Sequence, residues 1–160
     1  MSEIVWISLG VLSAILVGVI AFVIQILVRI KINKSKIKNT LIQIRGQVEI
    51  KHDLLKEYLE MNKDLIDADV YVNLNNKLNS YRYKKEFNID TIKEFNDFYS
   101  YHLNNFNDNL LIKQCKESDL KIDYIKDYYN ELVSYFNEYK SNGVNYFFAK
   151  AMAIEDEKLY

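Results

Sequence analysis

The feature that most constrains this chain is a run of apolar residues near its N-terminus. No charged side chain occurs from Ile4 to Val28, and Gln25 is the only strongly polar residue within the run. At about 1.5 Å per residue, a helix of this length reaches roughly 37 Å, against a hydrocarbon core of about 30 Å. Because a lone span can satisfy its backbone polar groups in lipid only as a helix, we expect a single transmembrane helix over residues 1–28. The span includes Ile4, Trp6, Gly10, Ala14, Gly18, Phe22 and Val28.

A cleaved signal peptide is the rival interpretation of the same run. Such a peptide needs a basic n-region, a shorter apolar core and a small-residue cleavage site. Here the charged residue before the run is Glu3, the run is too long, and no Ala-x-Ala pattern follows it. We therefore expect the helix to be retained as an anchor.

The charges that flank the run predict its orientation. Only Glu3 precedes it, whereas a basic stalk, residues 29–38, follows it. The positive-inside rule places this stalk in the cytoplasm and the N-terminus outside. Two roles stay open for the stalk. It can attract anionic lipid, at about 1 kcal/mol per basic residue, or its charges can determine only the orientation of the span. Its basic residues are Arg29, Lys31, Lys34, Lys36 and Lys38.

Small residues recur every four positions along one face of the span, at Gly10, Ala14 and Gly18. Small side chains allow the close approach of a second membrane helix. Two interpretations stay open: a face for self-association, or the ordinary use of small residues in such helices.

Beyond residue 38 the apolar pattern becomes helical. One apolar stripe covers residues 37–65 at alternating steps of four and three, and it is broken only by Lys51 and Asn62. A second stripe covers residues 111–139 and keeps its phase through Ser118. This period predicts two long helices, each packed along its length.

Shorter helical patterns lie between and after these stripes. Residues 71–81 and 92–102 predict two more helices, with Asp90 as the N-cap of the second, and residues 145–154 predict a short terminal one. Gly143 stands where a C-terminal cap of the last long helix belongs. The sequence therefore predicts an all-α protein, an N-terminal single transmembrane helix followed by an up-and-down antiparallel four-helix bundle over residues 39–160. Further N-caps are offered by Asn107, Asp108 and Asn109.

No constellation of residues predicts catalysis, a metal or a cofactor. His52 and His102 have no clustered ligands, and His52 and Asp53, being adjacent on a helix, are expected to point apart, so we expect solvated or lightly packed histidines. Cys115 lies on an apolar stripe, as a small core residue does. No phosphate-binding loop or nucleophile elbow occurs, and a net charge of −1 gives no nucleic-acid signal. We expect no enzyme, no cofactor and no nucleic-acid partner.

Two surface features leave alternatives open. A row of carboxylates on the last long helix predicts either a cation site or a solvated face, and Lys126 beside it favours the solvated face. Aromatic residues crowd the C-terminal part and predict either packing or an exposed patch for a partner. The carboxylates are Asp123, Asp127 and Glu131, and the aromatics are Tyr128, Tyr129, Tyr135, Phe136, Tyr139, Tyr146, Phe147 and Phe148.

Two short motifs resemble the LemA family of bacterial membrane proteins. The family's Q-L-x-x-R-Y-D-L-I-P-N-L is similar to residues 47–58, and its Y-N-x-x-V-x-x-Y-N is similar to residues 129–137. The layout of one span before a helical bundle is also similar, and Ala149 falls where the family has the Ala of N-L-I-A. The matching motif positions are Gln47, Asp53, Leu54, Tyr129, Asn130, Val133 and Asn137.

The chain departs from the family pattern at several positions. Lys56 stands where the family has Pro, Phe136 replaces the second Tyr of the late motif, and Gly143 with Val144 replaces Phe-Pro. Residues 66–110 match only in helical character.

The resemblance implies an antiparallel four-helix bundle, an outside N-terminus and no established enzymatic activity. We therefore expect a non-enzymatic interaction or scaffold module at the cytoplasmic face of a bacterial membrane, with membrane lipid and another protein as partners. The alternative is a sensor that self-associates through the face formed by Gly10, Ala14 and Gly18 and passes a signal through the anchor. We expect Tyr129 to serve helix packing. For Asn130 and Asn137 two interpretations stay open, helix packing or a surface that binds a partner.

Overall fold

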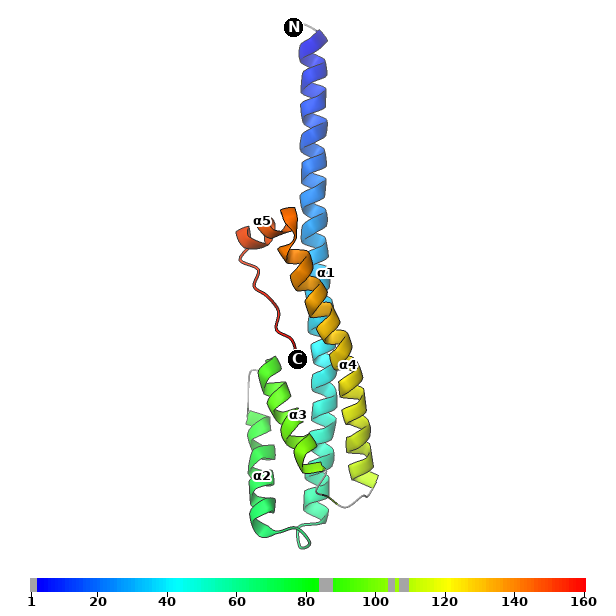
Figure 1. Ribbon diagram of the computed structural model, residues 1–160, viewed down its shortest axis with the longest axis vertical. Coiled ribbons are helices and arrows are strands. Elements are labelled where there is room, and N and C mark those ends of the chain that lie inside the picture. The colour runs from blue at the N-terminus through cyan, green and yellow to red at the C-terminus, as the bar shows by residue number, and fades with distance from the viewer. Residues whose placement is uncertain (1–2, 84–87, 104–105, 107–109) are drawn as a thin grey trace. The chain divides into compact units, whose positions relative to one another are not determined.

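A computed structural model describes residues 3–83, 88–103, 106 and 110–160 (Figure 1). Within these residues the chain forms five helices and no strand, which confirms the all-α class for the described part. The helices are α1 (Glu3–Met61), α2 (Ala68–Tyr83), α3 (Ile89–Leu103), α4 (Leu110–Ser141) and α5 (Gly143–Ala151).

The chain divides into two compact units. The first, which we call the anchor unit, comprises Met1–Lys36 and Tyr135–Glu157. The second, the helical unit, comprises Ile37–Ser134 and Lys158–Tyr160. Helices α1 and α4 each contribute a segment to both units.

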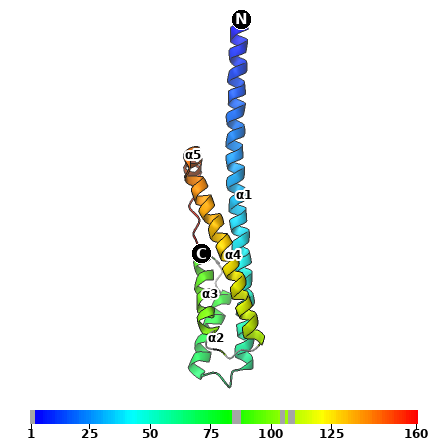
Figure 2. The same cartoon turned by 45° about the vertical axis from the view of Figure 1, so that its right-hand side comes forward.

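In the helical unit, α2 and α3 lie side by side in both views of the structure (Figures 1 and 2). The two predicted stripes contribute to the core, since Ile44 and Val48 of α1 and Ile122 of α4 are fully buried. On α4 the buried face also takes in Val133, next to the predicted position Leu132, which is only half-buried. Cys115 is fully buried on the same stripe of α4, as expected for a small core residue. Further fully buried side chains come from α3 and α4, namely Phe95, Tyr99 and Ile112.

The first stripe ends earlier than its period predicts. Helix α1 stops at Met61, and Leu65 is 84% exposed, so the expected helix to Leu65 is wrong. The Asn62 side chain donates to the Tyr58 carbonyl oxygen at 2.8 Å, and the same oxygen accepts from the Asn62 backbone N–H at 3.1 Å. Asn competes with the helical backbone for hydrogen bonds in this way, which favours a turn here over another helical turn.

Helix starts are set by side chains that precede the predicted ones. The Asn88 side chain accepts from the Thr91 backbone N–H at 2.9 Å and is the N-cap of α3. The prediction of Asp90 is therefore wrong: Asp90 lies in the first turn, where its charge favours the helix dipole. Asp67 caps α2 by accepting from the Asp69 N–H at 3.0 Å. The N-caps expected at Asn107, Asp108 and Asn109 lie outside the described residues.

The predicted end of α4 and the terminal helix both occur. Gly143 has a φ of +49°, in the left-handed region that Gly enters without a Cβ penalty, and it lies two residues after α4 ends at Ser141. Helix α5 follows, two residues earlier than the expected start at Asn145.

In the anchor unit, the first part of α1 is the one helix among the described residues that is long and apolar enough to cross a membrane. Its apolar side chains are uncovered, with Trp6 62%, Leu12 69% and Phe22 50% exposed. Near the end of the apolar run the side chains become covered, and Ile26 and Ile30 are only 3% and 4% exposed.

Candidate functional site

The most unusual group in the helical unit is a buried lysine. Lys51 interrupts the apolar stripe of α1, yet its side chain is 0% exposed. Its ammonium donates to the Asn96 Oδ1 atom at 3.1 Å, to the Ser100 Oγ atom at 2.9 Å and to the Asp119 carboxylate. Ser100 donates in turn to Asp119 at 3.1 Å. The network therefore ties α1 to α3 and α4 inside the core.

The protonation of Lys51 follows from these contacts. Burial lowers the pKa of Lys51, and the Asp119 carboxylate opposes that shift. An ammonium group has three donors, and here all three have an acceptor. The paired Lys51 side chain therefore links α1 to α3 and α4 inside the core.

A polar cavity of about 330 Å³ lies beside this network. Asp119 is the group that both share, because its side chain is 25% exposed while it pairs with Lys51. Carboxylates and amines line the cavity together, which leaves it without a strong excess of either charge. The lining residues are Lys93, Asn96, Asp97, Ser100, Asp119, Asp123, Lys126 and Tyr160.

The carboxylate row of α4 is a solvated face. Asp123, Asp127 and Glu131 are all exposed, and Asp123 lies 3.7 Å from the Lys126 Nζ atom. Among the residues that the structure describes, no group of three potential metal ligands comes together.

His52 is buried rather than lightly packed, contrary to expectation. Its ring stacks on Tyr81 at 5.0 Å between centroids, and its Nε2 atom lies 3.0 Å from the Leu78 carbonyl oxygen. Its Nδ1 atom lies 3.0 Å from the Asp53 carboxylate, so the adjacent side chains turn toward each other. The partners occupy both ring nitrogens, which makes His52 a link between α1 and α2. The sequence hides this because the partner on α2 is a backbone carbonyl.

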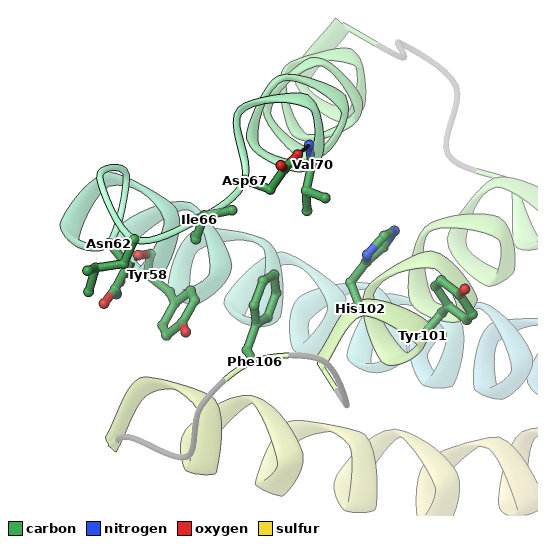
Figure 3. A pocket seen from close by; sticks show the side chains of 9 residues that line it. Tyr58, Asn62, Ile66, Asp67, Val70, Tyr101, His102 and Phe106 are labelled. Atoms are coloured by element: carbon green, nitrogen blue, oxygen red, sulfur yellow. Dashed lines mark hydrogen bonds between the residues drawn. The ribbon is translucent and has the colours of Figure 1, made fainter.

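A second cavity, of about 460 Å³, opens where α1 and α3 end and α2 begins (Figure 3). The rings of Tyr58 and Phe106 lie side by side in it, 4.8 Å apart, and His102 points into the same space. Burial lowers the pKa of His102, so its ring is less readily protonated than a free one. The cavity presents polar and apolar surface in equal measure, which suits a side chain or small molecule that carries both kinds of group. The remaining lining residues are Asn62, Leu65, Ile66, Asp67, Val70 and Tyr101.

The late motif contacts the C-terminal segment of the same chain. In the helical unit, Tyr129 is 2% exposed and its hydroxyl donates to the Lys158 carbonyl oxygen at 3.1 Å. Asn130 accepts from the Tyr160 backbone N–H at 2.8 Å. In the anchor unit, Asn137 pairs with both backbone groups of Glu157, donating at 3.0 Å and accepting at 3.1 Å. The two Asn side chains thus hold backbone that follows α5 and is not helical.

The other motif positions have mixed surroundings. Val133 is fully buried, Leu54 is half-buried, and the Asp53 side chain is 71% exposed. Gln47 lines a shallow apolar hollow with Tyr124, and its buried Oε1 atom has no hydrogen-bond partner among the described residues.

The predicted membrane residues gather in the anchor unit. The small face is open, since a Cβ added at Gly10 or Gly18 would meet nothing within 4 Å, and Ala14 between them is exposed. Ile4 lies in α1, but its side chain is outside the described part. The exposed members of the span and stalk are Trp6, Phe22, Val28, Arg29, Lys31, Lys34 and Lys36, and Lys38 is exposed in the helical unit.

Comparisons with known proteins add no relative. No protein-family model matches the chain, and searches of curated proteins and of solved structures return no match either.

Proposed function

We propose that this protein is a membrane-anchored helical protein that presents its helical unit to a partner protein at the cytoplasmic face of a bacterial membrane, without catalysing a reaction. In this proposal the helical unit is an up-and-down antiparallel four-helix bundle of the LemA type. Support for the family rests on the two motifs and on the layout of the chain.

The observation that carries the proposal is the uncovered state of the first part of α1. Only 6% of its most apolar 18-residue window is buried, whereas a core helix of a soluble protein would be mostly covered. Soluble proteins rarely expose apolar patches beyond a few hundred Å². A bilayer is the environment that covers every side of such a helix at once, because lipid tails surround it.

The direction of insertion follows from the basic stalk. Arg29 and Lys31 are exposed and can therefore reach the cytoplasmic headgroups that the positive-inside rule assigns to them. Lys34 lies 3.5 Å from the Glu157 carboxylate, so part of its charge is neutralised within the anchor unit. The helical unit would then face the cytoplasm.

The partner would be a protein, and the cavity of Figure 3 is the contact site that we assign to it. Its lining includes Leu65 and Tyr101, which are 84% and 71% exposed, and Tyr is a residue type that is enriched in protein interfaces. An apolar side chain of the partner would insert beside Tyr58 and Phe106.

Membrane extraction tests the anchor directly. The full chain should stay in the membrane pellet after alkaline carbonate washing, and a chain lacking residues 4–28 should move to the supernatant. A matched control replaces the exposed Leu120 and Tyr124 of the helical unit with Ser, which should leave the full chain in the pellet. Release of the full chain by carbonate would overturn the proposal.

A second candidate function is a self-associating sensor, favoured by the open face of Gly10 and Gly18. Helix α1 has no break between the span and Met61, so a change of helix contacts in the membrane could be passed along it. Replacing both Gly residues by Ile should abolish a crosslinked dimer in cells. The matched pair Val11→Ile and Val19→Ile, one position further along, should retain it. An unchanged dimer in the Gly variants would rule out this candidate.

A further inference from the structure

Helix α5 leaves an apolar and aromatic face uncovered. Val144, Tyr146 and Phe147 are 52%, 48% and 71% exposed, and Met152 just beyond the helix is 53% exposed. The opposite side is covered, with Ala149 at 3%. The exposed face carries one charge, Lys150, whose ammonium lies 5.8 Å from the centre of the Tyr146 ring.

The helix is fixed in place by polar contacts within the anchor unit. The Asn145 side chain donates to the Tyr139 carbonyl oxygen at 3.0 Å, which ties the start of α5 to the end of α4. Lys140 donates to the Ile154 carbonyl oxygen at 3.1 Å and pairs with the Asp156 carboxylate, which ties down the segment that follows α5. The exposed face is therefore not the result of a loose chain end.

The start of α5 lies beside the end of the membrane span. A hollow of about 250 Å³ is lined by Phe22, Gln25, Ile26 and Arg29 of α1 together with Tyr139 and Asn145. Within the anchor unit, α5 runs across the direction of α1 in Figure 1, and the turned view of Figure 2 shows it nearly end-on. A helix that crosses a spanning helix in this way lies parallel to the membrane surface.

The depth of this contact follows from the length of the apolar run. A hydrocarbon core of about 30 Å takes up about 20 helical residues, so a span that begins at Ile4 reaches the inner boundary near residues 22–28. The hollow that joins α1 to α5 is lined from this stretch. Helix α5 therefore stands at the level of the headgroups on the basic side of the span.

We propose that α5 is a second membrane contact of this protein, an interfacial helix whose Val144, Tyr146 and Phe147 enter the headgroup region of the cytoplasmic leaflet. Aromatic residues concentrate at this depth, and amphipathic helices bury an apolar face there. Lys150 extends its charge toward the lipid phosphates, as lysines near such interfaces do. The inference rests on the proposed function, because only a spanning α1 brings a bilayer to this level. The lipid contact would fix the depth and the tilt of the anchor unit in the membrane.

Fluorescence of a single tryptophan reads out the position of α5 in the full chain. Trp6 is the only Trp, so the variant Trp6→Phe with Phe147→Trp carries one reporter on α5. In phosphatidylethanolamine and phosphatidylglycerol vesicles whose acyl chains are brominated near the glycerol, this reporter should be quenched and its emission shifted to shorter wavelength. Tyr146→Trp in the same background is a second reporter with the same expected result.

The control reporter Tyr124→Trp, in the Trp6→Phe background, sits on an exposed residue of the helical unit and should keep its fluorescence. The unmodified chain, whose Trp6 lies in the span, tests the anchor separately. Quenching of Trp6 without quenching of either α5 reporter overturns the inference and leaves the proposed function standing. A blue-shifted but unquenched α5 reporter indicates a protein contact, such as a second copy, and also overturns it. Absence of Trp6 quenching means that the proposed function itself fails.

Discussion

The Lys51 ammonium of α1 and the Asp119 carboxylate of α4 form an ion pair whose lysine is fully buried and whose aspartate reaches the rim of a polar cavity. Ser100 of α3 connects the two, accepting from Lys51 and donating to Asp119. The pair is therefore asymmetric, since water can solvate Asp119 when Lys51 is absent, but it cannot solvate Lys51 when Asp119 is absent.

This asymmetry predicts unequal costs of breaking the pair. Removing one partner of a buried ion pair costs about 3–5 kcal/mol of unfolding free energy. We expect Asp119→Leu to lie at the upper end of that range and Lys51→Met at the lower end. The double variant should cost less than the sum of the two, because no unpaired charge remains. Denaturant unfolding of the detergent-solubilised chain, followed by circular dichroism, measures all three.

The control for this cycle is the exposed pair Arg45 and Glu49, joined at 2.7 Å on the surface of α1. Arg45→Met should change stability by less than about 1 kcal/mol, as exposed pairs do. If the losses of unfolding free energy in Lys51→Met and Asp119→Leu simply add up in the double variant, the two side chains are not coupled.

The hydrogen bond from the Tyr160 backbone N–H to Asn130 predicts a C-terminal clamp. Asn130→Ala should cost about 1 kcal/mol, the usual net contribution of one such bond. It should also speed the removal of Tyr160 by carboxypeptidase, since the last residue is no longer held. Glu131→Ala, at the exposed neighbouring position, should leave the cleavage rate unchanged. Equal rates for both variants would mean that the clamp does not form.

The partly buried environment of His102 predicts a loss of stability on acidification. Burial lowers the pKa of His102 below its ordinary value of 6.5, so the unfolded chain binds a proton more readily than the folded one. Stability is then complete above pH 6.5 and is lost as the pH falls from 6.5 toward the folded pKa. His102→Gln should flatten this part of the profile. Unfolding measured between pH 7.5 and 5.5 gives the comparison, and parallel profiles for the two chains would contradict it.

The end of α5 contains a residue in an unfavourable conformation. Ala153 has a φ of 48°, which Gly adopts without a Cβ penalty. Ala153→Gly should therefore raise the free energy of unfolding by up to about 1 kcal/mol. Ala151→Gly, two residues earlier and at the last position of the helix, should lower it by up to about 1 kcal/mol. Changes of the same sign, read from thermal unfolding of the two variants, would contradict the left-handed cap.

Apolar periodicity predicted the helices of this chain because one buried face needs a regular spacing. Ile44 and Ile122 lie in the core where their stripes place them. The spacing of apolar residues could not predict where α1 ends, because the hydrogen bond of the Asn62 side chain determines the end locally. It also could not choose Asn88 over Asp90 as a cap, since both residue types cap well.

The polar interior was less accessible to sequence reasoning. A lysine on an apolar stripe needs a buried acceptor, and that requirement could have pointed to Asp119 beside Ser118 on the opposing stripe. Asn130 and Tyr160 could not be paired in advance, because the segment after α5 has no periodic pattern to place it. Long-range contacts of this kind depend on the tertiary fold.

The sidedness of the helical unit tests the central claim most directly. Cys115 is buried and its thiol pKa is raised to about 11, so Cys115→Ala can remove it as a background label with little change to the surface. Tyr124→Cys then places a thiol at a position that is 80% exposed in the helical unit, and Ser2→Cys serves as the reporter for the opposite side. With a membrane-impermeant thiol reagent, we expect Ser2→Cys to be labelled in intact bacterial cells and Tyr124→Cys only after permeabilisation. Labelling of Tyr124→Cys in intact cells would contradict a cytoplasmic helical unit.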